Sequence, residues 1–146
     1  MRIDGAMRPP GIVSGAKMFS LIFENEKLFV IHTGPGLASQ QLYSSALNGK
    51  RLSRGLINNI AVGMVAKRTI NKVMRGQERI DNGDINELVK EKHSVLIPKS
   101  NINNVKLTTR YHDIRLEIMT TDKKYKFDCP LFEKENVEEL CSLLKN

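Results

Sequence analysis

A regular alternation of apolar and polar residues in the second half of the chain restricts the fold more than any other feature. The residues that recur at every second position are Val105, Leu107, Thr109, Tyr111, Ile114, Leu116, Ile118, Tyr125 and Phe127. A period of two is typical of β-strands that have one buried and one solvated face. Polar residues at 112–113 and 121–123 interrupt the alternation, so the sequence predicts a three-stranded antiparallel meander.

Shorter elements flank this meander. Residues 18–24 and 28–33 are β-rich runs joined by a polar turn, which predicts a hairpin that ends at Gly34-Pro35-Gly36. Val95-Leu96-Ile97 predicts a further short strand, with Pro98 at its edge or end. The chain closes on an amphipathic helix, which we expect to cover the open end of the sheet. Its apolar stripe consists of Val137, Leu140, Cys141 and Leu144.

Residues 37–92 separate the two groups of strands and have helical spacing. Asp84 followed by Glu87 resembles a capping box and predicts the start of a short helix near the end of this segment. The apolar stripe of the main helix consists of Leu56, Ile57, Ile60, Ala61, Met64 and Val65. It continues, shifted around the helix, with Ile70, Val73 and Met74. A chain of 146 residues fits one domain, so we expect a single domain, 1–146, with a helical insert at 37–92.

The excess positive charge of the chain is concentrated in this insert. Residues 50–79 hold eight basic side chains and one acidic one, whereas the remainder of the chain holds 15 of each. A nearly neutral body is therefore expected to carry a cationic helix. The expected contacts for an anionic partner are Arg51, Arg54, Lys67, Arg68, Lys72 and Arg75.

Three kinds of partner fit a cationic amphipathic insert. The first is another protein or a second copy of the chain, bound through the apolar residues Leu56, Ile57, Ile60 and Met64. The second is an anionic membrane surface, to which each nearby cation contributes about 1 kcal/mol. The third is nucleic-acid phosphate, which is disfavoured because residues 44–110 contain no Phe, Tyr or Trp for base stacking. The same absence removes the aromatic anchors that are common at membrane interfaces.

No pattern typical of catalysis, a metal site or a cofactor is present. His32, His93 and His112 have neither triad nor metal-ligand spacing. Cys129 and Cys141 match neither a disulfide framework nor a metal motif. We therefore expect a protein that is not an enzyme and needs no cofactor. The first residues lack the apolar run of a secretory signal, so we expect it in the cytoplasm, with the inner membrane surface as an alternative.

Two segments of the chain resemble a known family of domains. They are VLIPKSNINNVKL, at 95–107, and LEIMTTDKKYKF, at 116–127. With the earlier hairpin, the insert and the terminal helix, they are similar to pleckstrin-homology-like (PH-like) domains of the GRAM and bacterial or archaeal type. The resemblance covers residues 18–33 and 93–146 and speaks to the fold more than to chemistry.

The resemblance implies an α+β protein that is mainly β. It implies a split, strongly bent antiparallel β-barrel, a C-terminal capping helix, and the helical insert after the second strand. In lipid-binding members, basic residues around the first hairpin loop hold phosphate groups. The first hairpin expected here has Glu24, Asn25, Glu26 and Lys27 in its loop, a net negative turn, so no binding residue is carried over from the family. We expect a non-catalytic binding or assembly module, with protein or self-association first among its partners.

Overall fold

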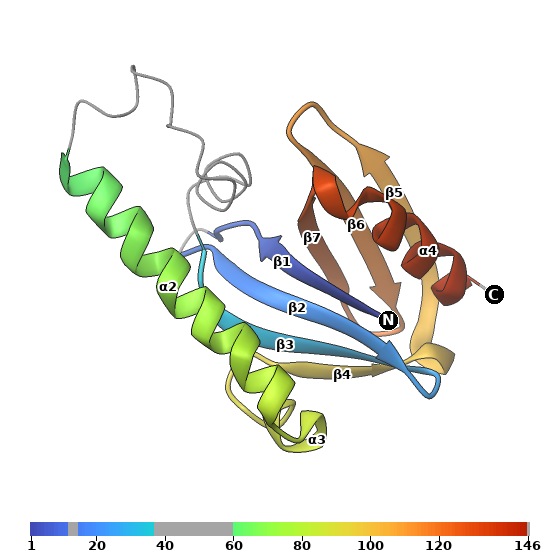
Figure 1. The fold of residues 1–146 in the computed structure, drawn as a ribbon. Helices are drawn as coiled ribbons and strands as arrows, with labels where there is room; N and C mark the ends of the chain where they lie inside the picture. Colours follow the sequence, from blue (N-terminus) through green and yellow to red (C-terminus); the bar gives the residue numbers. More distant parts are fainter. Residues whose placement is uncertain (12–14, 37–59, 146) are drawn as a thin grey trace.

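Seven antiparallel strands form one sheet, with a helix packed on each side (Figure 1). The computed structural model describes residues 1–11, 15–36 and 60–145, and side chains only from residue 67 onward in the last range. The strands are β1 (Arg2–Arg8), β2 (Lys17–Glu24), β3 (Lys27–Pro35), β4 (Val95–Pro98), β5 (Ile102–Thr109), β6 (Asp113–Thr120) and β7 (Lys124–Pro130). The helices are α2 (Ile60–Asn82), α3 (Ile85–Leu88) and α4 (Lys134–Lys145), with 3-10 turns η1 (Lys99–Asn101) and η2 (Leu131–Glu133).

The order of strands in the sheet is β4-β3-β2-β1-β7-β6-β5, so β4 and β5 are its two edges and the sheet is not closed. An antiparallel, mainly β protein of the α+β class is confirmed. The β5–β7 meander, the β2–β3 hairpin, the short strand β4 and the C-terminal helix all lie where the sequence predicts them.

Strand β1 was not predicted from the sequence. Its residues do not alternate, because the register with β2 shifts between Ile3 and Ala6, and Gly5 adopts a left-handed φ of 73°. A bulge of this kind inserts an extra residue and breaks the period of two. β1 pairs with β2 and, at Met7↔Asp128, with β7, and so joins the two halves of the sheet. The expectation of an insert after the second strand is therefore wrong: the insert follows the third strand.

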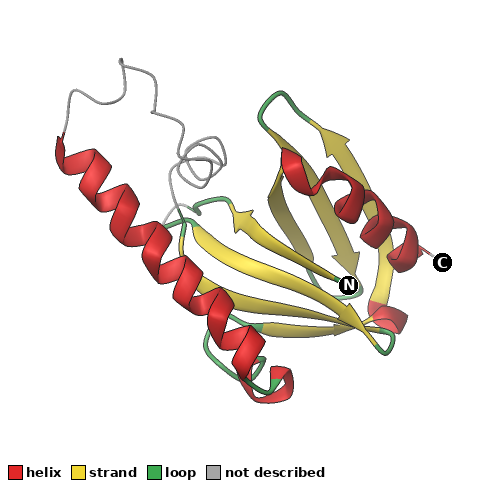
Figure 2. Cartoon of the chain, in the orientation of Figure 1, coloured by secondary structure: helices red, strands yellow, loops and turns green. Residues whose placement is uncertain are grey.

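The main core lies between the sheet and α4. The stripe predicted for the terminal helix is buried there, against inward-facing residues of both halves of the sheet, such as Phe19, Leu116 and Phe127. Figure 2 shows α4 beside β5 and β6, and α2 on the other side of the molecule, along β2 and β3. The apolar side chains of both sheet faces are therefore covered by helices over much of their length.

Helix α2 approaches β3 very closely. A Cβ atom at Gly76 would lie 2.0 Å from the carbonyl oxygen of Thr33, so only glycine fits this position. Val73 is fully buried against Gly34, and Ile70 packs with Met7 and Met18. This part of the predicted apolar stripe is thus covered within the same chain.

Polar contacts fix the C-terminal end of the same helix. Arg2 of β1 forms an ion pair with Asp81, and its Nη2 donates a hydrogen bond to the carbonyl of Gln77 at 3.2 Å. Asp84 caps α3 as predicted, because its side chain accepts a hydrogen bond from the backbone N–H of Asn86 at 2.8 Å. The last turns of α2 are therefore held on the sheet by Arg2, and the start of α3 is capped by Asp84.

Candidate anion-binding surface

Basic residues from four separate segments meet at one end of the sheet. β1 ends at Arg8, β2 begins at Lys17, His32 lies near the end of β3, and Lys92-His93 immediately precede β4. Because neighbouring strands run in opposite directions, these positions share one end of the sheet. Arg8 and Lys17 are direct cross-strand partners. We call Arg8, Lys17, His32, Lys92 and His93 the sheet-end cluster.

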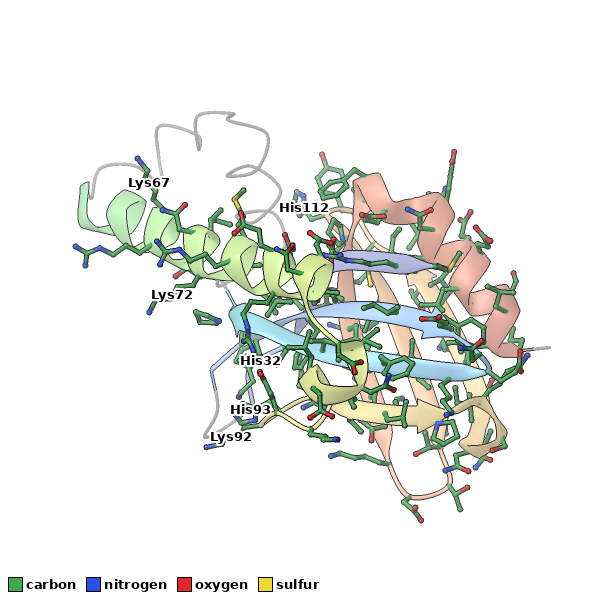
Figure 3. The ribbon with its side chains drawn as sticks, turned by 60° about the horizontal axis from the view of Figure 1, so that its bottom comes forward. His32, Lys67, Lys72, Lys92, His93 and His112 are labelled. Carbon is green, nitrogen blue, oxygen red and sulfur yellow. The ribbon has the colours of Figure 1, made fainter. Side chains whose placement is uncertain are left out.

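The two histidines of the sheet-end cluster are in contact. Their ring centroids lie 5.3 Å apart in an edge-to-face arrangement, and His32 also contacts the Phe19 ring at 5.5 Å. The backbone N–H of His32 donates to Ser94 Oγ at 2.9 Å, which holds the segment before β4 against β3. Figure 3 shows His32, His93 and Lys92 together on this side of the molecule. The His32 Nε2 atom is buried and has no hydrogen-bond partner among the described residues.

The net effect of burial and nearby charges is to lower the pKa of both histidines, although a hydrogen bond with the Gly34 backbone and the charge of Glu91 oppose it at His32. Burial lowers the pKa of His32, and the positive charges of His93 and Lys17 lower it further. Partial desolvation, followed by the charges of Lys17, Lys92 and Arg8, lowers the pKa of His93. A neighbouring cation disfavours a second positive charge, so both rings favour the neutral form. The cluster is therefore a region of positive potential.

The carboxylate closest in sequence to this cluster is already engaged. Glu91 precedes Lys92, but it forms an ion pair with Arg79 of α2. In the ranges that the structure describes, no ion pair joins Arg8, Lys17 or Lys92 to an acidic side chain. Within the described ranges, these three cations thus have no ion-pair partner of opposite sign.

A row of cations on α2 extends this positive region. Arg68, Lys72, Arg75 and Arg79 follow one another at intervals of four, three and four residues, which places them on one face of the helix. This face is distinct from the one that buries Val73. In the view of Figure 3, Lys72 projects at the same end of the molecule as His32, His93 and Lys92. Arg79 connects the row to the cluster through Glu91, and we call Arg68, Lys72 and Arg75 the α2 stripe.

The structure describes the side chains of only some of the contact residues that the sequence predicts. Lys67, Arg68, Lys72 and Arg75 are exposed on α2, as a binding role requires, and within the described part of the chain none forms an ion pair. Arg51, Arg54, Leu56 and Ile57 lie outside the described residues, and Ile60 and Met64 belong to α2 but lie outside the described side chains. Their predicted contacts stay predictions.

The basic residues outside 50–79 were missed by sequence reasoning. Arg8 and Lys17 are single cations in nearly neutral surroundings, Lys92 follows Lys90 and Glu91, and nothing in these local patterns distinguishes them. A correct assignment of β1 was the missing signal, because it makes Arg8 the end of one strand and Lys17 the start of the next. The spacing of the histidines in the sequence also did not indicate that His32 and His93 are in contact.

A hollow of about 480 Å³ lies on the open side of the sheet, between β4 and the β6–β7 turn. Its lining includes Leu96, Lys123 and Tyr125. The Lys123 Nζ atom lies 5.4 Å from the Tyr125 ring, and the Arg8 guanidinium lies 5.9 Å from the same ring. Arg8, a member of the sheet-end cluster, therefore contacts a residue that lines this hollow.

Neither a metal site nor a membrane-spanning helix is present in the described ranges. Over the described ranges, no three His, Cys, Asp or Glu side chains lie close enough to hold a metal ion together. No helix in those ranges combines the length and apolar character needed to cross a bilayer. Comparison of the chain with protein-family models, curated proteins and solved structures gave no significant match.

Proposed function

We propose that this chain is a non-catalytic binding module that attaches to an anionic membrane surface through the sheet-end cluster and the α2 stripe. One observation carries the proposal. Cations at the end of β1, the start of β2 and the segment before β4 share one end of the sheet, and the ion pair between Glu91 and Arg79 links this end to the row of cations on α2.

The number of cations on this surface is large enough to give a micromolar affinity for anionic lipid. Each basic residue near an anionic lipid surface contributes about 1 kcal/mol. The six lysines and arginines of this surface together contribute about 6 kcal/mol, which corresponds to a Kd of tens of micromolar. The six residues are Arg8, Lys17, Arg68, Lys72, Arg75 and Lys92. This binding requires no aromatic anchor, which the insert lacks.

A PH-like fold forms part of this proposal. It is supported by the succession of four and three antiparallel strands and by a C-terminal helix packed on the core. Strand β1 also changes which loop is the first hairpin loop. That loop runs from Arg8 to Lys17, so it is flanked by cations, whereas the acidic turn at Glu24–Lys27 joins the second and third strands. The net negative turn is therefore not the first hairpin loop, and it no longer argues against phosphate recognition at that loop.

Self-association or binding to another protein stays a prediction for the undescribed part of the insert. Its proposed contacts include Leu56, Ile57, Ile60 and Met64. Ile70 and Val73 are not available for it, because they pack against the sheet of the same chain. Nucleic-acid phosphate is a third candidate, and binding experiments separate it from lipid.

The proposal can be tested by vesicle co-sedimentation with two charge-matched variants. The test variant carries Arg68→Glu, Lys72→Glu and Arg75→Glu. The control carries Lys27→Glu, Lys106→Glu and Lys145→Glu, all exposed and, within the described residues, in no ion pair. Both variants have the same net charge. Loss of three cations at about 1 kcal/mol each predicts an affinity about 100-fold lower for the test variant on phosphatidylserine vesicles.

The control variant should bind within about threefold of the unmodified protein, because its charges lie away from the proposed surface. Equal losses in both variants would mean that net charge alone drives the attraction. Absence of sedimentation with anionic vesicles, together with tight binding to a DNA duplex, would replace the membrane by nucleic acid as the partner.

A further inference from the structure

We propose that the His32–His93 pair takes up protons when the sheet-end cluster meets an anionic surface, so that membrane attachment strengthens as the pH falls from 7.5 to 5.5. This inference rests on the function proposed above and concerns its regulation. Its starting point is the contact between two imidazoles inside a group of lysines and an arginine.

The geometry fixes both rings at the surface that would face the membrane. His32 is held by the hydrogen bond of its backbone N–H to Ser94 and by the edge contact of its ring with Phe19. His93 adopts a left-handed φ of 73°, which is uncommon for a residue with a Cβ atom, and its side chain is exposed. The Nε2 atom of His32 is buried without a hydrogen-bond partner among the described residues, so in the free protein no acceptor within them stabilises a proton there.

Charged groups from every neighbouring element act on this pair. β1 contributes Arg8, β2 contributes Lys17, and the segment before β4 contributes Lys92. Glu91 is the acidic group that acts on His32, and it is paired with Arg79 of α2. In the free protein the lysines and the arginine oppose a positive charge on either ring, so both imidazoles remain largely neutral at neutral pH.

An anionic surface reverses this balance. Lipid phosphates and carboxylates bring negative charge next to the cluster, and a nearby opposite charge favours the protonated imidazole. The pKa of each histidine is then higher in the bound state than in the free state, so binding takes up protons. If attachment raises each pKa by about one unit, affinity increases by up to about tenfold for each histidine.

The experiment measures binding to phosphatidylserine vesicles at pH 7.5 and pH 5.5, because the charge of that headgroup is constant between them. The variants are His32→Gln, His93→Gln and the double variant. His112→Gln is the matched control, because His112 is exposed and packs against Tyr111 in the β5–β6 turn. Figure 3 shows it apart from the sheet-end cluster.

We expect the affinity of the unmodified protein and of His112→Gln to rise by about 10-fold to 100-fold on acidification. The affinity of the double variant should change by less than about threefold between the two pH values. Equal pH dependence in the double variant and the unmodified protein would overturn the inference and leave the proposed function standing. Absence of binding at both pH values would overturn both.

A second measurement needs no substitution and covers the case in which a variant does not fold. Calorimetric titration of the unmodified protein with vesicles near pH 6.5, in two buffers of different ionisation enthalpy, reports the protons taken up on binding. Uptake of about one proton for each bound molecule supports the proposal. Identical binding enthalpies in the two buffers would refute it.

Discussion

The contact between Gly76 and β3 gives the sharpest test of how α2 is placed. In Gly76→Ala, the new Cβ atom would lie 2.0 Å from the carbonyl oxygen of Thr33, which is a backbone atom of β3. Heavy atoms do not approach closer than about 3 Å without a hydrogen bond. The helix must therefore move away from β3 by about 1 Å.

Such a movement loosens the two apolar side chains that seat the helix. Burial of Ile70 and Val73 stabilises the fold by about 1.5–3 kcal/mol each. A gap of about 1 Å forfeits roughly a quarter to a half of their contact energy, and residual strain adds about 1–3 kcal/mol. Alanine returns up to about 1 kcal/mol through its helix propensity. We expect a net loss of about 2–3 kcal/mol.

The measurement is urea unfolding followed by circular dichroism, with amide hydrogen exchange along α2. Gly15→Ala is the control, because a Cβ atom at Gly15 has no neighbour within 4 Å. We expect it to change stability by less than about 1 kcal/mol. Exchange in α2 should become faster in Gly76→Ala and remain unchanged in Gly15→Ala.

An unchanged or increased stability of Gly76→Ala would refute this reasoning. It is the result expected for a solvent-exposed helix, where alanine is simply the better helix former. The α2 stripe would then have no fixed orientation relative to the sheet-end cluster. If the helix does move, anionic vesicles should also bind Gly76→Ala less tightly than they bind Gly15→Ala.

Two further predictions concern the β6–β7 half of the sheet. Asp128 is buried and accepts hydrogen bonds from Arg115 Nε at 2.8 Å and Nη2 at 3.1 Å, and Arg110 Nη2 lies 2.9 Å away. Both arginines are partly exposed, so Asp128→Asn should destabilise the fold by about 2 kcal/mol in urea unfolding, and a loss below about 0.5 kcal/mol would contradict this network. Burial raises the pKa of Cys129 far above its usual range, and Cys141 is also buried. A disulfide reagent should therefore react with neither thiol until urea unfolds the chain, and rapid modification of the native protein would contradict their burial.

The strands that could be predicted from the sequence are those whose burial alternates along the chain. Ile114, Leu116 and Ile118 are all fully buried on one face of β6, and the polar positions between them are partly exposed. The four apolar residues predicted for the C-terminal helix are buried for the same reason. In these segments the apolar residues of the sequence pattern are also the residues that are buried in the structure, so the pattern alone predicts the element.

β1 escaped prediction because its pattern reflects partners that are distant in sequence. Gly5 introduces a bulge, and the polar side chains of β1 have specific partners. Asp4 accepts a hydrogen bond from Ser20 and pairs with Arg2, which also reaches Asp81 of α2. A strand whose polar groups are satisfied across the fold does not alternate, so composition alone makes it resemble a loop.

The candidate site, like the fold, could be predicted from the sequence only in part. The sequence by itself determined that residues 50–79 carry the excess positive charge and that part of this charge lies on a helix. Only the tertiary structure decided that Arg8, Lys17 and Lys92 join it, and that Glu91 is engaged by Arg79. The physical reason is that charge compensation depends on distance through space, which strand pairing sets between residues far apart in the chain.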